Sequence, residues 1–196
     1  MPATLRRYEP HDADALTRIC LLTGSSGLDA TGRYSADRVL GDIYAVPYAV
    51  RDPHWAWVVD DGEGAKGYLV ATPDTTAFEE WFITSWWPER DAAYRADANA
   101  ETLALIDGVA RRREDAARYA DTYPAHLHIN LLDDLRGGGW GRTLIETLTA
   151  QLREHGVPGV HLVASLDNEN AQRFYEKLGF ERLDAGDAAA YGMRLD

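Results

Sequence analysis

Four glycines stand within five residues, at 137–141, between an apolar segment and a helical pattern. Because glycine lacks a Cβ atom, it adopts positive φ values and lets a ligand approach the backbone closely. A helix that begins directly after such a turn presents unpaired N–H groups and the positive end of its dipole. The succession of strand, glycine turn and helix start therefore predicts an anion-binding site, most often one for phosphate.

The spacing of these glycines limits which phosphate ligand fits. A dinucleotide fingerprint starting at Gly139 would need a glycine where Leu144 stands, and a P-loop would need a lysine after the glycines. The pattern R-x-x-G-x-G does fit, with Arg136, Gly139 and Gly141. A glycine-rich turn between a strand and a helix, without a ligand, is the alternative interpretation of this segment alone.

A second motif follows 27 residues after Gly141. The pattern N-x-x-A-x-x-x-Y-x-x-x-G-F is formed by Asn168, Ala171, Tyr175, Gly179 and Phe180. Together, in this order and at this spacing, the two motifs resemble those of the GNAT (Gcn5-related N-acetyltransferase) superfamily. The resemblance rests on motifs over residues 126–184 and on the order of elements over 4–72. It implies an α/β fold with a mixed sheet of about seven strands flanked by helices, and acetyl-CoA as co-substrate.

A finer resemblance lies outside the two motifs. Residues 32–34, residues 41–44, the aromatic stretch after residue 74 and residues 121–129 look like bacterial acetyltransferases related to the C-terminal domain of eukaryotic O-GlcNAcase. That eukaryotic domain is regarded as a pseudo-acetyltransferase. The intact glycine loop favours genuine binding of acetyl-CoA. The two motifs together imply an N-acetyltransferase that transfers acetyl directly to an amine. The alternative is a non-catalytic module that binds acetyl-CoA.

The resemblance implies a coenzyme site made largely of backbone groups. The strand before the loop is expected to separate from its neighbour and to pair with the pantetheine arm through Ile129 and Leu131, and the Leu131 N–H would polarise the acetyl carbonyl. The loop would hold the pyrophosphate through Arg136, Gly137, Gly138, Gly139, Trp140 and Gly141, with Arg142 and Asn168 close by. Solvent-exposed charges are the alternative for both arginines, and an N-cap of its own helix is the alternative for Asn168.

Acetylation of an amine needs an acid for the leaving thiolate and a base for the incoming ammonium. Tyr175 matches the family tyrosine that donates to sulfur, and a phenol with a pKa of about 10 suits a thiolate whose thiol has a pKa of about 8.5; mere packing is its alternative. His126 and His128 share one face of the expected strand, and a pKa of about 6.5 suits a base acting through water. Asp74 is the competing base, and a structural, hydrogen-bonded role is the alternative for either histidine.

Composition restricts the function further. The net charge of −12 over 196 residues argues against binding nucleic acid or an anionic membrane, and it is compatible with a cationic amine acceptor or with solubility alone. With no apolar run of about 18 residues and no apolar signal near the N-terminus, a cytoplasmic protein is expected. Cys20, in a helical apolar pattern, is expected to be buried. No cluster has metal-ligand spacing, so no metal is expected. The acceptor and the oligomeric state stay open.

Residues 1–196 are expected to form one domain. Turn-bounded segments predict strands at 4–8, 55–59, 66–72, 126–131, 159–164, 180–183 and 188–195, and the strands at 126–131 and 159–164 are expected to pair in parallel. Periodicity predicts helices at 12–22, from 35, at 141–155 and at 168–178, with Asp12 and Ser35 as N-caps and Pro47 limiting the second. Residues 74–123 are expected to be a helical insertion, whose aromatic residues form either a core of their own or the wall of a substrate pocket.

Overall fold

The computed structural model describes residues 2–109, 111, 118–184 and 189–195. Within these residues, seven strands form one sheet in the order β1-β2-β3-β4-β5-β7-β6. The strands are β1 Thr4–Arg7, β2 Ala56–Asp60, β3 Ala65–Thr72, β4 Ala125–Leu131, β5 Gly159–Ala164, β6 Glu181–Leu183 and β7 Ala189–Arg194. Neighbouring strands are antiparallel except β4 and β5, which run parallel. The predicted mixed sheet and its parallel pair are confirmed.

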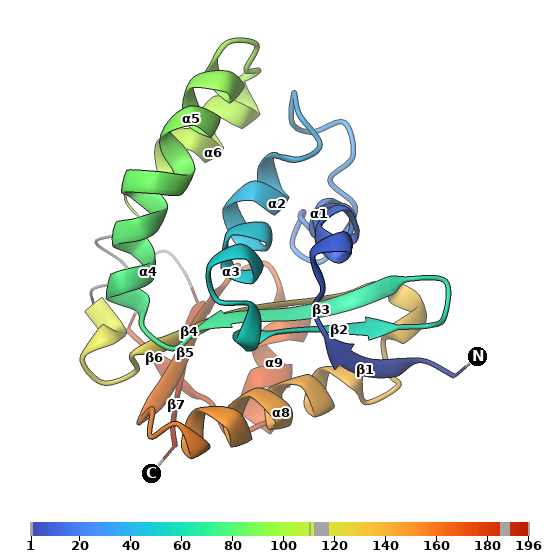
Figure 1. Ribbon diagram of the computed structural model, residues 1–196, viewed down its shortest axis with the longest axis vertical. Coiled ribbons are helices and arrows are strands. Elements are labelled where there is room, and N and C mark those ends of the chain that lie inside the picture. Colours follow the sequence, from blue (N-terminus) through green and yellow to red (C-terminus); the bar gives the residue numbers. More distant parts are fainter. Residues whose placement is uncertain (1, 110, 112–117, 185–188, 196) are drawn as a thin grey trace.

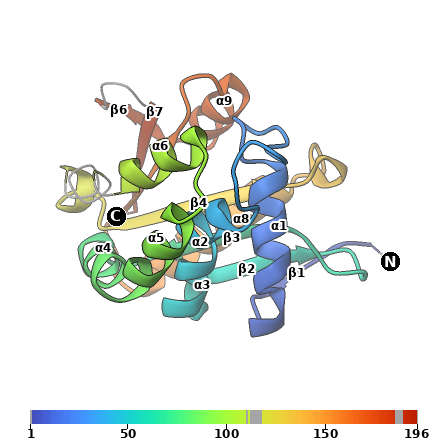
Figure 2. The ribbon, with the colours of Figure 1, turned by 90° about the horizontal axis from the view of Figure 1, so that it is seen from above.

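Helices cover both faces of this sheet. They are α1 Ala13–Leu22, α2 Val39–Tyr44, α3 Val46–Arg51, α4 Thr75–Trp81, α5 Trp87–Arg95, α6 Ala100–Val109, α8 Trp140–Glu154 and α9 Glu169–Lys177. In Figure 1, α1, α2 and α3 lie above the sheet and α8 and α9 lie below it, while α4, α5 and α6 rise beside α2 and α3. Seen from above, β4 crosses the middle of the molecule beneath α2 and α6 (Figure 2). The central strand is therefore enclosed between two helical layers.

Alternation along the strands builds a core on each face. On β2, Trp57 and Val59 pack with the apolar stripe of α8, whereas Val58 packs with α1, α2 and α3. Such alternation follows from the period of two of an extended chain, and each fully buried large apolar side chain contributes about 1.5–3 kcal/mol to stability. Trp55 and Trp57 lie in the same core, below the sheet.

The aromatic residues of the predicted insertion join the core above the sheet. Phe82, in a π-helical turn between α4 and α5, and Trp86 and Trp87 are buried in the cluster that also contains residues of α1, α2 and α3. The indole of Trp86 donates to the carbonyl of Asp42 on α2 (2.8 Å), and the hydroxyl of Tyr94 donates to its carboxylate (2.6 Å). The expectation of a separate core was therefore wrong. Residues 110, 112–117 and 188, which belong to the predicted insertion and last strand, lie outside the described residues.

Of the predicted N-caps, neither Asp12 nor Ser35 makes a side-chain capping hydrogen bond to its predicted helix. Asp12 is the N-cap residue of α1, as predicted, but its carboxylate pairs with Arg6 (2.7 Å) and makes no hydrogen bond to the first turn. Ser35 bonds through its N–H and hydroxyl to the hydroxyl of Thr102 on α6, and α2 begins only at Val39. Pro47 lies in the first turn of α3, where a missing N–H costs nothing, so the chain continues as a helix.

Candidate active site

The parallel pair β4 and β5 separates soon after it begins. Ala125 lies opposite Val160 and His126 opposite His161, and the register extends no further. On its other edge, β4 pairs with β3 over six residues, from His126 opposite Thr72 to Leu131 opposite Gly67. Most of the β4 edge that faces β5 is therefore open, as the family resemblance predicts for this strand.

The direction of the backbone groups on β4 follows from its pairing with β3. Directly after the strand, the N–H of Leu132 donates to the carbonyl of Lys66 at 2.9 Å. Because successive backbone groups of a strand point to opposite edges, the N–H groups of Leu131 and Ile129 are directed toward the split with β5. The Leu131 N–H thus has the orientation that the predicted oxyanion donor requires.

A cavity of about 580 Å³ lies beside the glycine loop, and we call it the loop cavity. Ten of the eleven residues predicted to bind the coenzyme line it: Ile129, Leu131, Arg136, Gly137, Gly139, Trp140, Gly141, Arg142, Asn168 and Tyr175. Gly138 lies in the same loop but outside this lining. The loop at 23–28 supplies Thr23, Ser26, Gly27 and Leu28 to the same lining. Residues distant in sequence are therefore gathered around one cavity.

Two glycines give the loop its shape and a third gives it room. Gly137 (φ +78°) and Gly139 (φ +82°) adopt the left-handed conformation, and Gly139 is the N-cap of α8. A Cβ atom on Gly141 would lie 2.9 Å from the ring of Phe174, so glycine there allows α8 to approach α9. The helix starts at Trp140, within one residue of the predicted start.

The polar side chains around the loop cavity form hydrogen bonds or ion pairs with other residues of the protein. Arg136 donates to the carbonyl of Gly27 (2.7 Å) and pairs with Asp133 (2.7 Å), which ties the 23–28 loop to the end of β4. Arg142 is exposed and approaches Glu146 at 3.4 Å. Asn168 accepts a hydrogen bond from the N–H of Ala171 and caps α9, which was its alternative interpretation.

Tyr175 is enclosed by aromatic rings at the inner side of the loop cavity. Its ring lies within 6 Å, centroid to centroid, of Phe174, Phe180 and Tyr191, and 7% of its surface is exposed. Burial raises the pKa of its phenol above the ordinary value of about 10. The hydroxyl therefore keeps its proton at neutral pH, as a proton donor must.

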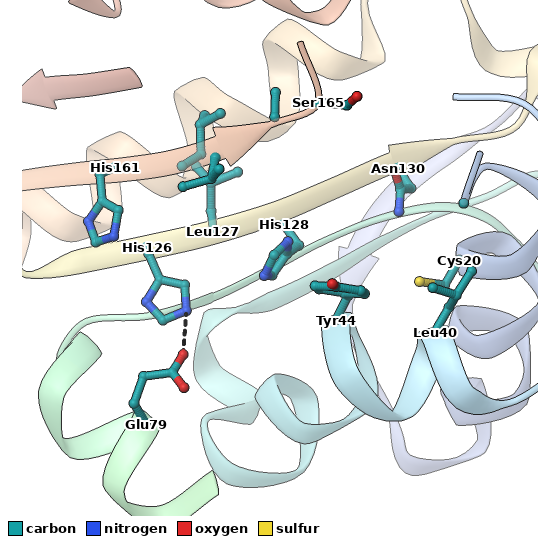
Figure 3. Close-up of a pocket in the computed structure, with 14 residues that line it drawn as sticks. Cys20, Leu40, Tyr44, Glu79, His126, Leu127, His128, Asn130, His161 and Ser165 are labelled. Atoms are coloured by element: carbon teal, nitrogen blue, oxygen red, sulfur yellow. Dashed lines mark ion pairs between the residues drawn. The ribbon is translucent and has the colours of Figure 1, made fainter. Parts of the chain in front are cut away.

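A second cavity, of about 430 Å³, opens in the split between β4 and β5, on the face of the sheet that carries α1, α2 and α4. We call it the histidine cavity. His126, His128 and His161 line it together with Glu79 of α4 and Tyr44 of α2 (Figure 3). Asn130 lines both cavities, so the two adjoin along β4. The two cavities therefore meet at the open edge of one strand.

Hydrogen bonds link the two predicted histidines through a tyrosine. The hydroxyl of Tyr48 on α3 lies 2.6 Å from Nε2 of His126 and 3.1 Å from Nε2 of His128. The hydroxyl of Thr75 lies 2.8 Å from Nδ1 of His126, and Oε1 of Glu79 is 3.9 Å from its Nε2. Sequence reasoning missed Tyr48, Thr75 and Glu79, because only the fold brings α3 and α4 next to β4.

Asp74, the competing base, lies outside both cavities. It is exposed and caps α4, accepting a hydrogen bond at 3.0 Å from the N–H of Ala77. The aromatic residues Trp81, Trp86 and Trp87 also line neither cavity, which speaks against their predicted role as a pocket wall. The geometry favours the histidines over Asp74 as the base.

Two further titratable residues of the histidine cavity are uncharged at neutral pH. His161 donates through Nδ1 to the carbonyl of Tyr123 (2.8 Å), and burial lowers its pKa. Burial raises the pKa of Cys20 to about 12, against the smaller opposite effect of its hydrogen bond to Tyr68. Cys20 is buried as predicted, and the sequence signal for His161 was a histidine within an otherwise apolar strand.

In the part of the chain that the structure describes, no three histidine, cysteine or acidic residues are grouped as metal ligands would be. Likewise, no helix among the described residues has both the length and the apolar character needed to cross a bilayer.

Comparison with known proteins agrees with this geometry. The sequence model of the acetyltransferase (GNAT) family matches residues 75–180. The crystal structure of SsHAT aligns over 100% of both chains with a TM-score of 0.89 and 34% sequence identity. A full-length match at this identity extends the likeness well beyond the two motifs.

This chain matches only parts of its longer curated relatives. Protein O-GlcNAcase of Rattus norvegicus is 20% identical over 181 residues, which cover 90% of this chain and 20% of that protein. A mycothiol acetyltransferase of Nocardiopsis dassonvillei is 47% identical over 108 residues, which cover 54% of this chain and 31% of that enzyme. The chain thus spans less than a third of either relative. Both resemblances drawn from the sequence are confirmed, and with a family match over more than half of its length the chain belongs to the acetyltransferase (GNAT) family.

Proposed function

We propose that this protein is an N-acetyltransferase that passes the acetyl group of acetyl-CoA directly to a primary amine. The observation that carries the proposal is the meeting of the loop cavity and the histidine cavity at the open edge of β4. One cavity has the features of a coenzyme site, and the other holds two candidate bases. Direct transfer needs both substrates at one place, and the open edge of β4 would be that place.

The loop cavity is the proposed donor site. Backbone N–H groups of the glycine loop, at the positive end of the α8 dipole, would bind the pyrophosphate. The N–H groups of Ile129 and Leu131 would bind the pantetheine arm and the acetyl carbonyl, because they are directed into the split. Arg136 contributes by holding the 23–28 loop over this cavity.

The histidine cavity is the proposed acceptor site. Among the described residues that line it, Glu79 is the one acidic or basic side chain apart from the histidines. A carboxylate favours an ammonium nearby, and it disfavours an acceptor with a phosphate or carboxylate beside the amine. The net charge of −12 likewise attracts cationic acceptors and repels anionic ones over longer distances.

The reaction follows from these assignments. His128 takes one proton from the ammonium, directly or through water, and the neutral nitrogen attacks the thioester carbon. The C–N bond forms while the Leu131 N–H stabilises the oxyanion, and the C–S bond then breaks. Tyr175 gives its proton to the thiolate and regains one from the acetylated nitrogen. One proton is released overall for each ammonium that is converted to an amide.

Release of CoA thiol in the presence of an amine panel tests this proposal. The panel pairs amines that lack an anionic group with amino acids and phosphorylated amines of similar size. We expect turnover with the former, and loss of about 100-fold or more in kcat on Tyr175→Phe. Binding of acetyl-CoA by calorimetry without thiol release for any amine would instead support the alternative, a non-catalytic acetyl-CoA-binding module.

A further inference from the structure

A continuous chain of hydrogen bonds runs from the histidine cavity into the protein interior. It begins at His128 on β4, passes through Tyr48 on α3 and His126 on β4, and ends at Thr75 on α4 and the carbonyl of Pro124. A hydroxyl has one hydrogen to donate, and a neutral imidazole has one N–H and one lone pair. The direction of every bond in this chain can therefore be derived from its inner end.

The inner end fixes the tautomer of His126. The hydroxyl of Thr75 donates to the Pro124 carbonyl at 2.7 Å, because a carbonyl oxygen can only accept. At 2.8 Å from Nδ1 of His126, the same hydroxyl oxygen must then act as the acceptor. Nδ1 of His126 consequently carries the hydrogen, and its Nε2 holds the lone pair when the ring is neutral.

The hydrogen bonds of Tyr48 give His128 the opposite tautomer to that of His126. Its one hydrogen is donated to Nε2 of His126, which is the shorter of its two contacts at 2.6 Å. The phenol oxygen then accepts from Nε2 of His128 at 3.1 Å. Nε2 of His128 carries a hydrogen, so its lone pair lies on Nδ1. The two histidines are held in opposite tautomers.

We propose that Tyr48 and Thr75 are positioning residues that make Nδ1 of His128 the proton acceptor in acetyl transfer. This inference rests on the proposed function. When Nδ1 takes a proton from the ammonium, the Nε2 proton can pass to the Tyr48 oxygen while the Tyr48 proton passes to Nε2 of His126. These two transfers within the chain neither add nor remove a proton or an electron. The positive charge thereby moves from His128 to His126, whose Nε2 lies 3.9 Å from the carboxylate of Glu79.

The surroundings hold Tyr48 rigidly in this role. Its ring is fully buried and stacks on Phe78 at 4.0 Å between centroids, and it meets both histidine rings edge-on at 5.0–5.1 Å. It does not line the histidine cavity, so it acts on the acceptor only through the histidines. The titratable groups that face the pair are Glu79 of α4, His161 of β5, Tyr44 of α2 and Tyr48 of α3.

The tautomers can be measured without any turnover. Long-range ¹H–¹⁵N spectra of the full chain at a pH above the histidine titrations separate the two neutral forms, and single His→Gln variants assign the signals. We expect hydrogen on Nδ1 of His126 and on Nε2 of His128. Hydrogen on Nε2 of His126 or on Nδ1 of His128 would overturn the inference, whereas absence of activity with intact tautomers would count against the proposed function alone.

Kinetics provide the second test, with a matched control. Tyr48→Phe keeps the stacked ring and removes the hydroxyl, and we expect kcat to fall by about tenfold or more, with the acceptor KM little changed and the midpoint of the pH profile shifted. Tyr94→Phe loses a 2.6 Å phenol–carboxylate bond outside both cavities and should keep the wild-type kcat. Unchanged kcat and pH profile in Tyr48→Phe would refute the inference.

Thr75 offers a variant pair if Tyr48→Phe does not fold. Thr75→Ser keeps the hydroxyl and should retain the Nδ1–H form of His126 and the wild-type rate. Thr75→Val has nearly the same shape without the hydroxyl, and it should lose both. Equal behaviour of the two variants in the spectra and in kcat would show that Thr75 does not position His126.

Discussion

Gly139 and Gly156 stand at opposite ends of α8, and they allow the binding role of the glycine loop to be separated from its role in stability. Gly139 (φ +82°) is the N-cap, Gly156 (φ +66°) follows the C-terminal end, and a Cβ atom on either would meet no atom within 4 Å. Alanine at either position therefore introduces backbone strain alone, about 1–2 kcal/mol. At roughly 2–4 °C per kcal/mol for a chain of this size, each variant should lower Tm by about 2–8 °C.

Coenzyme binding should distinguish the two variants. Gly139 lines the loop cavity and Gly156 does not. If the loop relieves its strain by leaving the left-handed conformation, the N–H groups at the start of α8 turn away from the pyrophosphate. A hydrogen bond to a charged group contributes about 1.5–3 kcal/mol, so the loss of one weakens acetyl-CoA binding by roughly 10- to 150-fold. Gly156→Ala should bind acetyl-CoA as the wild type does.

Calorimetric titration with acetyl-CoA and thermal melts of the same preparations measure both quantities. We expect similar losses of Tm in the two variants and a raised Kd for acetyl-CoA in Gly139→Ala alone. A wild-type Kd in Gly139→Ala, despite the lowered Tm, would refute the assignment of the loop as the phosphate site. A raised Kd in both variants would show that strain anywhere in α8 is transmitted to the cavity, and it would equally remove the argument for Gly139.

Three further predictions concern single side chains. Because burial raises the pKa of Tyr175, the proton donor should not limit thiol release up to about pH 10, and Tyr175→Phe should lower kcat at every pH below it. Burial raises the pKa of Cys20 to about 12, so iodoacetamide at pH 8 should label it only after denaturation; rapid labelling of the folded protein would contradict this. Burial raises the pKa of Asp12, but opposing effects, foremost the hydrogen bonds from Arg6, together outweigh it and lower that pKa below the ordinary value. The ionised Asp12 carboxylate therefore stabilises the folded protein above pH ~4, and this contribution is lost as the pH falls through the lowered pKa. In urea unfolding, Asp12→Asn should be less stable than the wild type at pH 6, and the difference should shrink at pH 3.

The coenzyme side of the site could be predicted because its residues are grouped in the sequence. The glycine loop and the segment from Asn168 to Tyr175 each place several residues on one turn or one helix, so that spacing alone relates them. The positive φ of Gly137 and Gly139 is what a glycine run before a helix leads one to expect. Ten of eleven predicted coenzyme residues accordingly line one cavity, and their binding role stays a prediction.

The partners of the histidines could not be predicted from the sequence. Tyr48 directly follows a proline in a segment that was expected to be the end of a helix, and Glu79 lies in an insertion whose position was unknown. A period of 3.6 identifies a buried helical face, but it does not say which strand that face meets. The strand order β5-β7-β6 could not be predicted for the same reason. A period of two identifies a strand, but it does not say which strand pairs with it.

The register of β4 decides which side chains lie on each face of the sheet and which N–H groups point into the split. The side chains of His126 and His128 meet Tyr48 above the sheet, whereas those of Ile129 and Leu131 pack toward α8 below it. A slip by one residue would exchange the two faces and would turn the Leu131 N–H away from the split. Since the edge toward β5 is open, pairing with β3 alone must specify this register. Gly67 contributes to it, because a Cβ atom there would lie 2.3 Å from the Leu131 side chain. The opening proposed to receive both substrates therefore depends on how β4 packs against β3 on its other edge.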